Sequence, residues 1–159
     1  MFKASLDITS KIISISIFLF SISFFVIEKL ILKMDEGFVY IPLLILLPIL
    51  ISTYIYSPKS YSVDMDNIIV NRMASNFFIS RKEIKSIVEI SSKEMGMPWR
   101  TFGNGGLFGY TGYYSSSKLG KMRWFVSQRK NYVLITMNNE SKFLLSPDDV
   151  AGFLAATQL

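Results

Sequence analysis

Two long apolar stretches lie close together in the first third of the chain. Residues 12–32 include 15 apolar side chains out of 21, and residues 38–56 include 15 out of 19. At about 1.5 Å of rise per residue, a helix of either length matches the hydrocarbon core of a bilayer. Only residues 33–37 join the two stretches, so the pattern predicts an antiparallel pair of transmembrane helices with both chain ends on one side.

A cleaved signal peptide is the competing interpretation of the first stretch. Lys3 and Lys11 resemble the basic front of such a peptide. However, residues 26–29 read Val-Ile-Glu-Lys, so no small-x-small cleavage pattern follows the apolar run. A second apolar stretch also follows almost at once. We therefore expect an uncleaved anchor.

Basic residues near the helix ends predict the orientation of this anchor. The side that holds the chain ends carries four of them: Lys3, Lys11, Lys59 and Arg72. The connecting turn carries two, Lys29 and Lys33, accompanied by Asp35 and Glu36. Because cytoplasmic segments are enriched in Lys and Arg, we expect a multi-pass protein of the inner membrane with its globular part in the cytoplasm.

The remainder of the chain, residues 57–159, has the texture of a β-rich domain. Short segments rich in β-branched and aromatic residues alternate with turn residues, which is typical of strands. Seven segments have this pattern: 61–63, 68–72, 76–80, 84–90, 121–127, 132–137 and 141–145. The domain boundary is therefore expected at residues 56 and 57, with an anchor over 1–56.

The chain ends in a helical pattern. Residues 146–149 read Ser-Pro-Asp-Asp, which combines an N-cap residue, a proline for the first turn and acids favoured by the helix dipole. Val150, Phe153 and Leu154 then recur at helical spacing and form one apolar stripe. The pattern predicts a helix over about 147–157 that packs on the strands.

Residues 98–114 form the most unusual segment. It contains five glycines and six aromatic residues: Gly103, Gly105, Gly106, Gly109, Gly112, Trp99, Phe102, Phe108, Tyr110, Tyr113 and Tyr114. Arg100 is its only charged residue. Glycine permits tight turns, and aromatic rings need a surface to bury against, so we expect a long, ordered loop.

This segment also carries a family resemblance. Residues 100–110 read RTFGNGGLFGY and are followed by Gly112. With the seven strands, the C-terminal helix and the preceding helices, the chain from about residue 56 onward resembles the bacterial pleckstrin-homology-like domain family. The resemblance implies a bent seven-stranded barrel closed at one end by the helix. It also implies a binding or scaffolding module, and it transfers no catalytic residues.

Three roles for the long loop stay open. Its rings could cover an open edge of the barrel, form a protein-binding surface, or insert shallowly into the membrane. A nucleotide site is disfavoured, because the glycine spacing differs by one residue from a dinucleotide fingerprint. The candidate binding residues are Trp99, Arg100, Phe102, Gly103, Gly105, Gly106, Phe108, Gly109 and Tyr110.

Charge adds a second candidate surface. Residues 57–159 contain 13 Lys and Arg against 8 Asp and Glu, and so carry the whole net charge of +5. Lys118, Lys121 and Arg123 are candidates for contact with anionic lipid, since each near-surface basic residue contributes about 1 kcal/mol. An ordinary solvated surface is the alternative. The modest charge excess and the membrane anchor disfavour nucleic acid.

Composition limits the chemistry. The chain has no cysteine and no histidine, which removes disulfides, thiol nucleophiles, imidazole bases and the commonest zinc ligands. We expect no cofactor, no metal and no enzymatic activity. The sequence therefore favours a membrane-anchored module that binds a protein partner at the inner membrane face. Recognition of an anionic lipid headgroup is the alternative, and a small-molecule or enzymatic role is a distant third.

Overall fold

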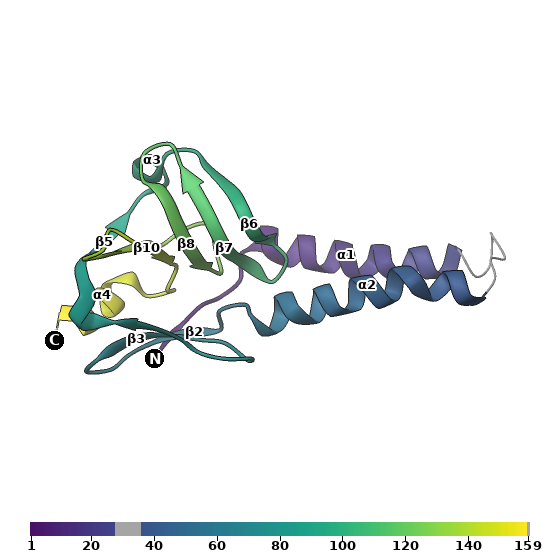
Figure 1. The fold of residues 1–159 in the computed structure, drawn as a ribbon, viewed down its shortest axis with the longest axis horizontal. Coiled ribbons are helices and arrows are strands. Elements are labelled where there is room, and N and C mark those ends of the chain that lie inside the picture. Colours follow the sequence, from purple (N-terminus) through teal and green to yellow (C-terminus); the bar gives the residue numbers. More distant parts are fainter. Residues whose placement is uncertain (28–35, 159) are drawn as a thin grey trace.

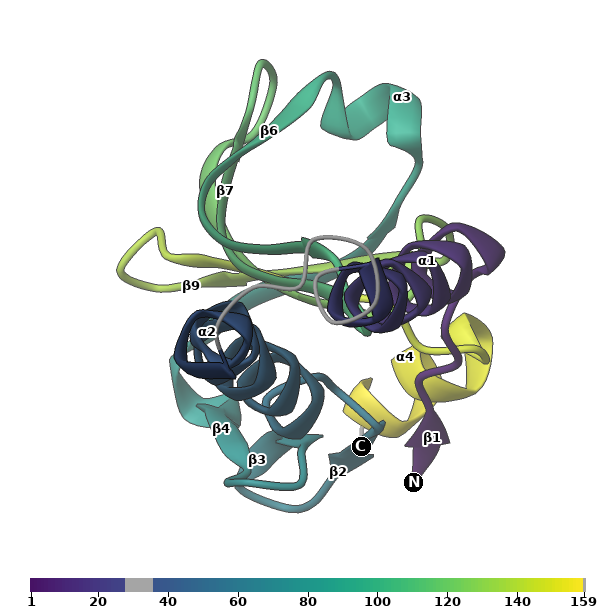
Figure 2. The same cartoon turned by 90° about the vertical axis from the view of Figure 1, so that its right-hand side faces the viewer.

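A computed structural model of the chain describes residues 1–27 and 36–158. Figure 1 shows a β-rich domain from which two helices project side by side. These helices are α1 (Ile8–Ile27) and α2 (Glu36–Ile55). The view along the helices in Figure 2 confirms that they remain neighbours and that the sheets of the domain lie around the helix ends that adjoin the domain.

The helices differ in how well they match a membrane span. Of the helices in the described ranges, α1 is long and apolar enough to cross a bilayer. The apolar segment Leu44–Ile55 of α2 is shorter. Helix α1 begins four residues before the predicted start at residue 12, because the carboxylate of Asp7 caps it by accepting the N–H of Ser10 at 2.7 Å. The predicted end of this span, residues 28–32, lies outside the described residues.

The domain contains two sheets. The first is antiparallel, in the order β1 (Phe2–Lys3), β2 (Ser60–Val63), β3 (Asn67–Asn71), β4 (Phe77–Ser80). The second has the order β5 (Ile84–Ile90), β9 (Tyr132–Met137), β10 (Lys142–Leu145), β8 (Gly120–Val126), β7 (Gly109–Ser116), β6 (Pro98–Gly106). Strands β8 and β10 pair in parallel, and the other neighbours are antiparallel. A 3-10 turn, Arg81–Glu83, and a short helix α3, Ser92–Met95, complete the connections.

All seven predicted strands are present, but the expected barrel is not. The two sheets, of four and six strands, do not close into a barrel. Three strands in the described part of the chain were not predicted: β1, β6 and β7. The last two replace the loop expected over residues 98–114, so that prediction was wrong.

The glycines explain why this segment is a hairpin rather than a loop. Gly103 and Gly112 face each other across β6 and β7, and both have positive φ, at 117° and 126°. A Cβ atom on Gly112 would overlap the carbonyl oxygen of Phe102, and one on Gly103 would overlap that of Thr111. The strands therefore approach each other at a place that only glycine can occupy.

The main core lies between the sheets and helix α4 (Val150–Gln158). Its fully buried members include Tyr61, Ile68, Val70, Ile79, Val133, Ile135, Leu145 and Phe153. The hydroxyl of Tyr61 donates to the carbonyl of Phe125 at 2.7 Å and accepts the N–H of Ser146 at 3.2 Å. Burial raises the pKa of Tyr61 to about 12, so this hydrogen-bonded hydroxyl stays neutral.

Helix α4 starts later than predicted. It begins at Val150 rather than near residue 147, and Asp149 caps it by accepting the N–H of Gly152 at 2.9 Å. The expected cap, Ser146, is fully buried and instead accepts the N–H of Ser127 at 2.9 Å. The predicted cap was therefore wrong, because the tertiary structure uses Ser146 to join two segments of the core and Asp149 takes the capping role.

The first seven residues are part of the β-rich domain. Strand β1 pairs with β2, with Phe2 opposite Tyr61. The ring of Phe2 also packs edge-on against Phe153 at 5.4 Å, and Ser5 donates its N–H to Asp148 at 3.1 Å. The helices are therefore attached to the domain at both of their near ends, by residues before α1 and after α2.

We expect Gly112→Ala to destabilise the domain by roughly 3 kcal/mol, because the new Cβ overlaps the facing strand at a positive φ. Gly120→Ala is the matched control. Gly120 also has a positive φ, of 71°, but a Cβ there meets nothing within 4 Å, so the cost is about 1 kcal/mol. Denaturant unfolding of the two variants measures the difference, and equal midpoints would contradict this account of the hairpin.

Candidate functional site

The tip of the β6–β7 hairpin is held against the helices. The buried hydroxyl of Ser10 donates to the carbonyl oxygen of Gly106 at 2.6 Å. The hydroxyl of Ser14, one turn further along α1, accepts the N–H of Phe108 at 2.9 Å. On the other side, the ring of Tyr54 from α2 meets that of Phe108 edge-on at 5.1 Å. We call these contacts the clamp, since they fix the hairpin to both helices.

Asp7 extends the clamp toward the sheet. Besides capping α1, its carboxylate accepts the backbone N–H of Arg129 at 3.0 Å and the hydroxyl of Tyr110 at 3.3 Å. The guanidinium of Arg129 lies 4.7 Å above the ring of Tyr110. One carboxylate thus joins the start of α1, strand β7 and the segment after β8, so that the helix start cannot move independently of the sheet.

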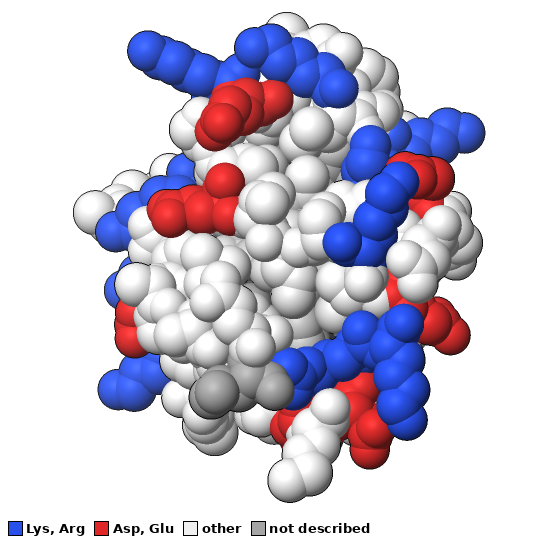
Figure 3. Space-filling view, turned by 90° about the vertical axis from the view of Figure 1, so that its left-hand side faces the viewer, with Lys and Arg blue, Asp and Glu red and all other residues white. Residues whose placement is uncertain are grey.

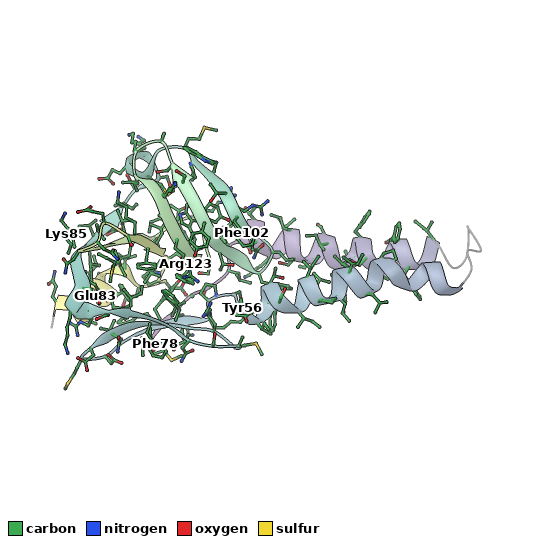
Figure 4. The ribbon with its side chains drawn as sticks, in the orientation of Figure 1. Tyr56, Phe78, Glu83, Lys85, Phe102 and Arg123 are labelled. Atoms are coloured by element: carbon green, nitrogen blue, oxygen red, sulfur yellow. The ribbon has the colours of Figure 1, made fainter. Side chains whose placement is uncertain are left out.

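A groove opens beside the clamp, between the last turns of α2 and the faces of β6, β7 and β8. Its volume is about 530 Å³. Helix α2 contributes Ile49, Ser52, Thr53 and Tyr56 to its wall. Figure 4 shows Tyr56 and Phe102 where the domain meets the helices, and Arg123 between the two sheets.

Three arginines from separate segments line this groove, which we call the arginine groove: Arg72, Arg100 and Arg123. The guanidinium carbon of Arg123 lies 4.5 Å from the centre of the Phe77 ring and 5.0 Å from that of Phe125. Stacking on aromatic faces holds a guanidinium in place and leaves the N–H groups at its edge available to a ligand.

Arg72 is held partly by the backbone. Its Nε donates to the carbonyl oxygen of Ser75 at 2.7 Å, and its guanidinium carbon lies 5.5 Å from the ring centre of Tyr56. Burial lowers the pKa of Arg72 from its ordinary value, and the positive charge of Arg123 lowers it further. Both effects disfavour the protonated form, which an anion between the two arginines would stabilise.

No Asp or Glu is among the described residues that line the arginine groove. The ion pairs found in the described ranges, Lys82 with Asp66 and Lys85 with Glu140, involve none of the three arginines. Figure 3 gives the contrast, because the face that points away from the helices carries acidic and basic side chains next to one another. Unbalanced positive charge therefore gathers on the side of the domain that adjoins α2.

The residues singled out in the sequence divide into three groups. Gly106, Phe108, Gly109 and Tyr110 belong to the clamp and its surroundings. Arg100, Phe102 and Gly103 line the arginine groove, and Gly105 lies under the Arg100 side chain. Trp99 lies half-exposed on β6, outside the groove lining.

The predicted basic cluster is only partly brought together. Arg123 lines the arginine groove, and Lys121 lies with it on a neighbouring groove of about 460 Å³ beyond Tyr113. Lys118 lies in the turn before β8 and instead donates to the carbonyl oxygen of Lys93 at 2.7 Å. Arg72 was not predicted as a binding residue, because the sequence around it does not indicate that the end of β3 lies next to β8 in the fold.

The architecture defines a class: a small β-rich module with a C-terminal helix, carried on apolar helices. Residues 59–158 match the family described as Bacterial PH domain, and the chain belongs to this family. The search of curated proteins and that of solved structures each returned no match. The family match begins after α2, so the clamp residues of α1 lie outside it.

The clamp makes a specific prediction about Ser14. Ser14→Ala leaves the Phe108 N–H without its partner, which costs about 1–2 kcal/mol, so amide exchange at Phe108 should accelerate about tenfold or more. Ser21→Ala is the matched control, because the hydroxyl of Ser21 donates within α1, to Ile17. Hydrogen exchange by mass spectrometry tests this, and unchanged protection of the hairpin in Ser14→Ala would disprove the clamp.

Proposed function

We propose that this protein is a membrane-anchored PH module whose arginine groove binds the phosphate group of an anionic lipid. The observation that carries the proposal is the arginine groove itself, where three arginines and no carboxylate of the described residues adjoin α2. Guanidinium groups bind phosphate through charge-assisted, often bidentate hydrogen bonds. A binding function accounts for the site, and we propose no enzymatic one.

The anchor is the first part of the proposal. Beyond α1, we propose that α2 also lies in the bilayer, as an antiparallel hairpin in the inner membrane with the domain in the cytoplasm. Exposed apolar side chains on both helices support this: Ile12, Ile15, Phe18, Leu19, Phe20, Leu44, Ile45 and Leu47. A signal sequence would be removed, whereas Ser10 and Ser14 are hydrogen-bonded to the domain, which supports a retained helix.

The location of the arginine groove supports a lipid ligand. Its wall includes Ile49 and Ser52, within the last two turns of α2, so the groove opens beside the segment that leaves the bilayer. A lipid headgroup next to α2 therefore reaches the arginines without leaving the membrane. Each basic residue near an anionic surface contributes about 1 kcal/mol of attraction.

Because the helices already hold the protein at the membrane, lipid binding has no need to recruit it. The tether also confines the groove to the layer of headgroups, where the local concentration of lipid is high. Weak binding is then sufficient. We propose that the arginine groove selects which lipid lies beside α2 and so makes the module sensitive to membrane composition.

Binding of a protein partner, the first expectation from the sequence, has less support. That hypothesis relied on the aromatic residues of residues 98–114. Phe108 and Tyr110 are engaged in the clamp, and Tyr114 is stacked on Trp124 at 4.1 Å within the core. Of the six aromatic residues, Trp99, Phe102 and Tyr113 remain exposed and available for such a surface.

We expect the full-length protein in detergent to bind short-chain phosphatidylglycerol and not phosphatidylcholine, with an affinity that falls steeply as salt increases. Arg123→Gln and Arg100→Gln should each weaken binding about tenfold, corresponding to one lost charge-assisted interaction. Isothermal titration calorimetry provides the measurement.

Lys118→Gln is the matched control, since it removes one positive charge outside the arginine groove. Thermal unfolding of each variant checks that the fold is retained. Equal binding of both lipids, or equal affinity of Arg123→Gln and Lys118→Gln, would rule out the proposed site.

A further inference from the structure

We infer that the tip of the β6–β7 hairpin, residues 106–109, is immersed in the membrane below the headgroups, with Phe102 at the boundary. The inference rests on the proposed function in one respect, namely that α1 and α2 cross the bilayer. It assigns the hairpin a direct contact with lipid, separate from phosphate binding in the arginine groove.

The depth of the tip follows from its contacts along α1. The last charged side chain of α1 is Lys11, which is exposed. Ser14, which holds the Phe108 N–H, is three residues deeper, or about 4.5 Å along the axis. Phe108 also lines an apolar groove of about 450 Å³ with Phe18 and Leu47. Gly106, held by Ser10, lies at the level of Lys11, and the tip extends from there to Phe108, which lies among mostly apolar residues of both helices.

The apolar residues that follow Lys11 leave little room to raise the tip out of the membrane. The described 20 residues of α1 extend about 30 Å, comparable to the thickness of the hydrocarbon core. Were the bilayer surface to lie beyond Ser14, the exposed apolar side chain of Ile12 would stand in water. A surface at the level of Lys11 instead keeps the lysine among the headgroups and covers the apolar residues that follow.

The backbone polar groups of the tip are hydrogen-bonded within the protein, as a surrounding without water requires. Turns at a water surface leave several N–H and C=O groups to solvent, which hydrocarbon does not allow. Here Ser10 donates to the carbonyl of Gly106, and Ser14 accepts the N–H of Phe108. The side chain of Asn104 accepts the N–H of Leu107 at 3.0 Å and donates to the carbonyls of Leu107 and Gly109. Five polar groups of one short turn are thus satisfied by side chains.

Phe102 marks where the strand leaves the membrane. Its side chain is 75% exposed, and it lines the arginine groove with Ser52 and Thr53 of α2. Strand β6 is an edge strand, and in the described part of the chain its outer edge pairs with no other strand. An unpaired edge is tolerated among hydrated headgroups but not in hydrocarbon, so β6 rises through the headgroup layer with the ring of Phe102 at its base.

Spin labels test this placement. Because the chain has no native cysteine to remove, each label can be attached to a single introduced cysteine. Labels go on Leu19→Cys in α1, Phe102→Cys in β6 and Met65→Cys, which is 94% exposed between β2 and β3. The full chain is reconstituted in liposomes, and collisions with oxygen and with a water-soluble nickel complex are measured. We expect the nickel collision rate at residue 102 to be several-fold lower than at residue 65.

A rate at residue 102 equal to that at residue 65, with residue 19 protected, overturns the immersed hairpin and leaves the anchor intact. Exposure of residue 19 to nickel overturns the anchor and the inference together. A second variant examines the tip itself: Phe108→Trp should add fluorescence that acyl-brominated lipid quenches, relative to the parent with Trp99 and Trp124. No added quenching in a folded Phe108→Trp protein also overturns the inference.

Discussion

Two serine hydroxyls on successive turns of α1 hold the hairpin tip, and the geometry of the arginine groove depends on this contact. Because Ser10 and Ser14 bind the backbone of residues 106 and 108, the position of β6 and β7 relative to the helices is fixed. The arginine groove is formed by α2 on one side and by these strands on the other, so it keeps its shape only while the clamp holds. In the proposed function, the helices are therefore part of the binding site as well as its tether to the membrane.

In the arginine groove, a single aromatic ring holds two positively charged side chains in place. Arg72 and Arg123 both lie over the ring of Phe125, at 5.7 and 5.0 Å from its centre, so one buried aromatic residue orders two flexible cations. The positive charges of Arg72 and Arg123 repel each other. In the proposed function, an anion bound between them would relieve this repulsion, and side chains already held by Phe125 would lose less entropy on binding.

The sequence predicted the regular parts of this fold and missed those that depend on distant partners. Strands such as Tyr132–Met137 carry their own apolar pattern and were found. Strands β6 and β7 were missed because their many glycines give the segment the composition of a loop. The glycines allow the two strands to approach closely, and they interrupt the alternation of apolar and polar residues that identifies a strand. Strand β1 is two residues long and is defined by its partner β2. The arginine groove joins Arg72, Arg100 and Arg123, which only strand pairing brings together.

The pairing of β1 with β2 has a consequence for the order of events during synthesis. Strand β1 leaves the ribosome first, but its partner follows only after both helices have been made. The segment that this pairing closes contains α1 and α2, and two helices that lie side by side bring its ends together at a smaller entropic cost than a flexible chain. The four-stranded sheet is thus completed only after both helices have been synthesised, so a fully formed domain reports that the whole helical segment has left the ribosome.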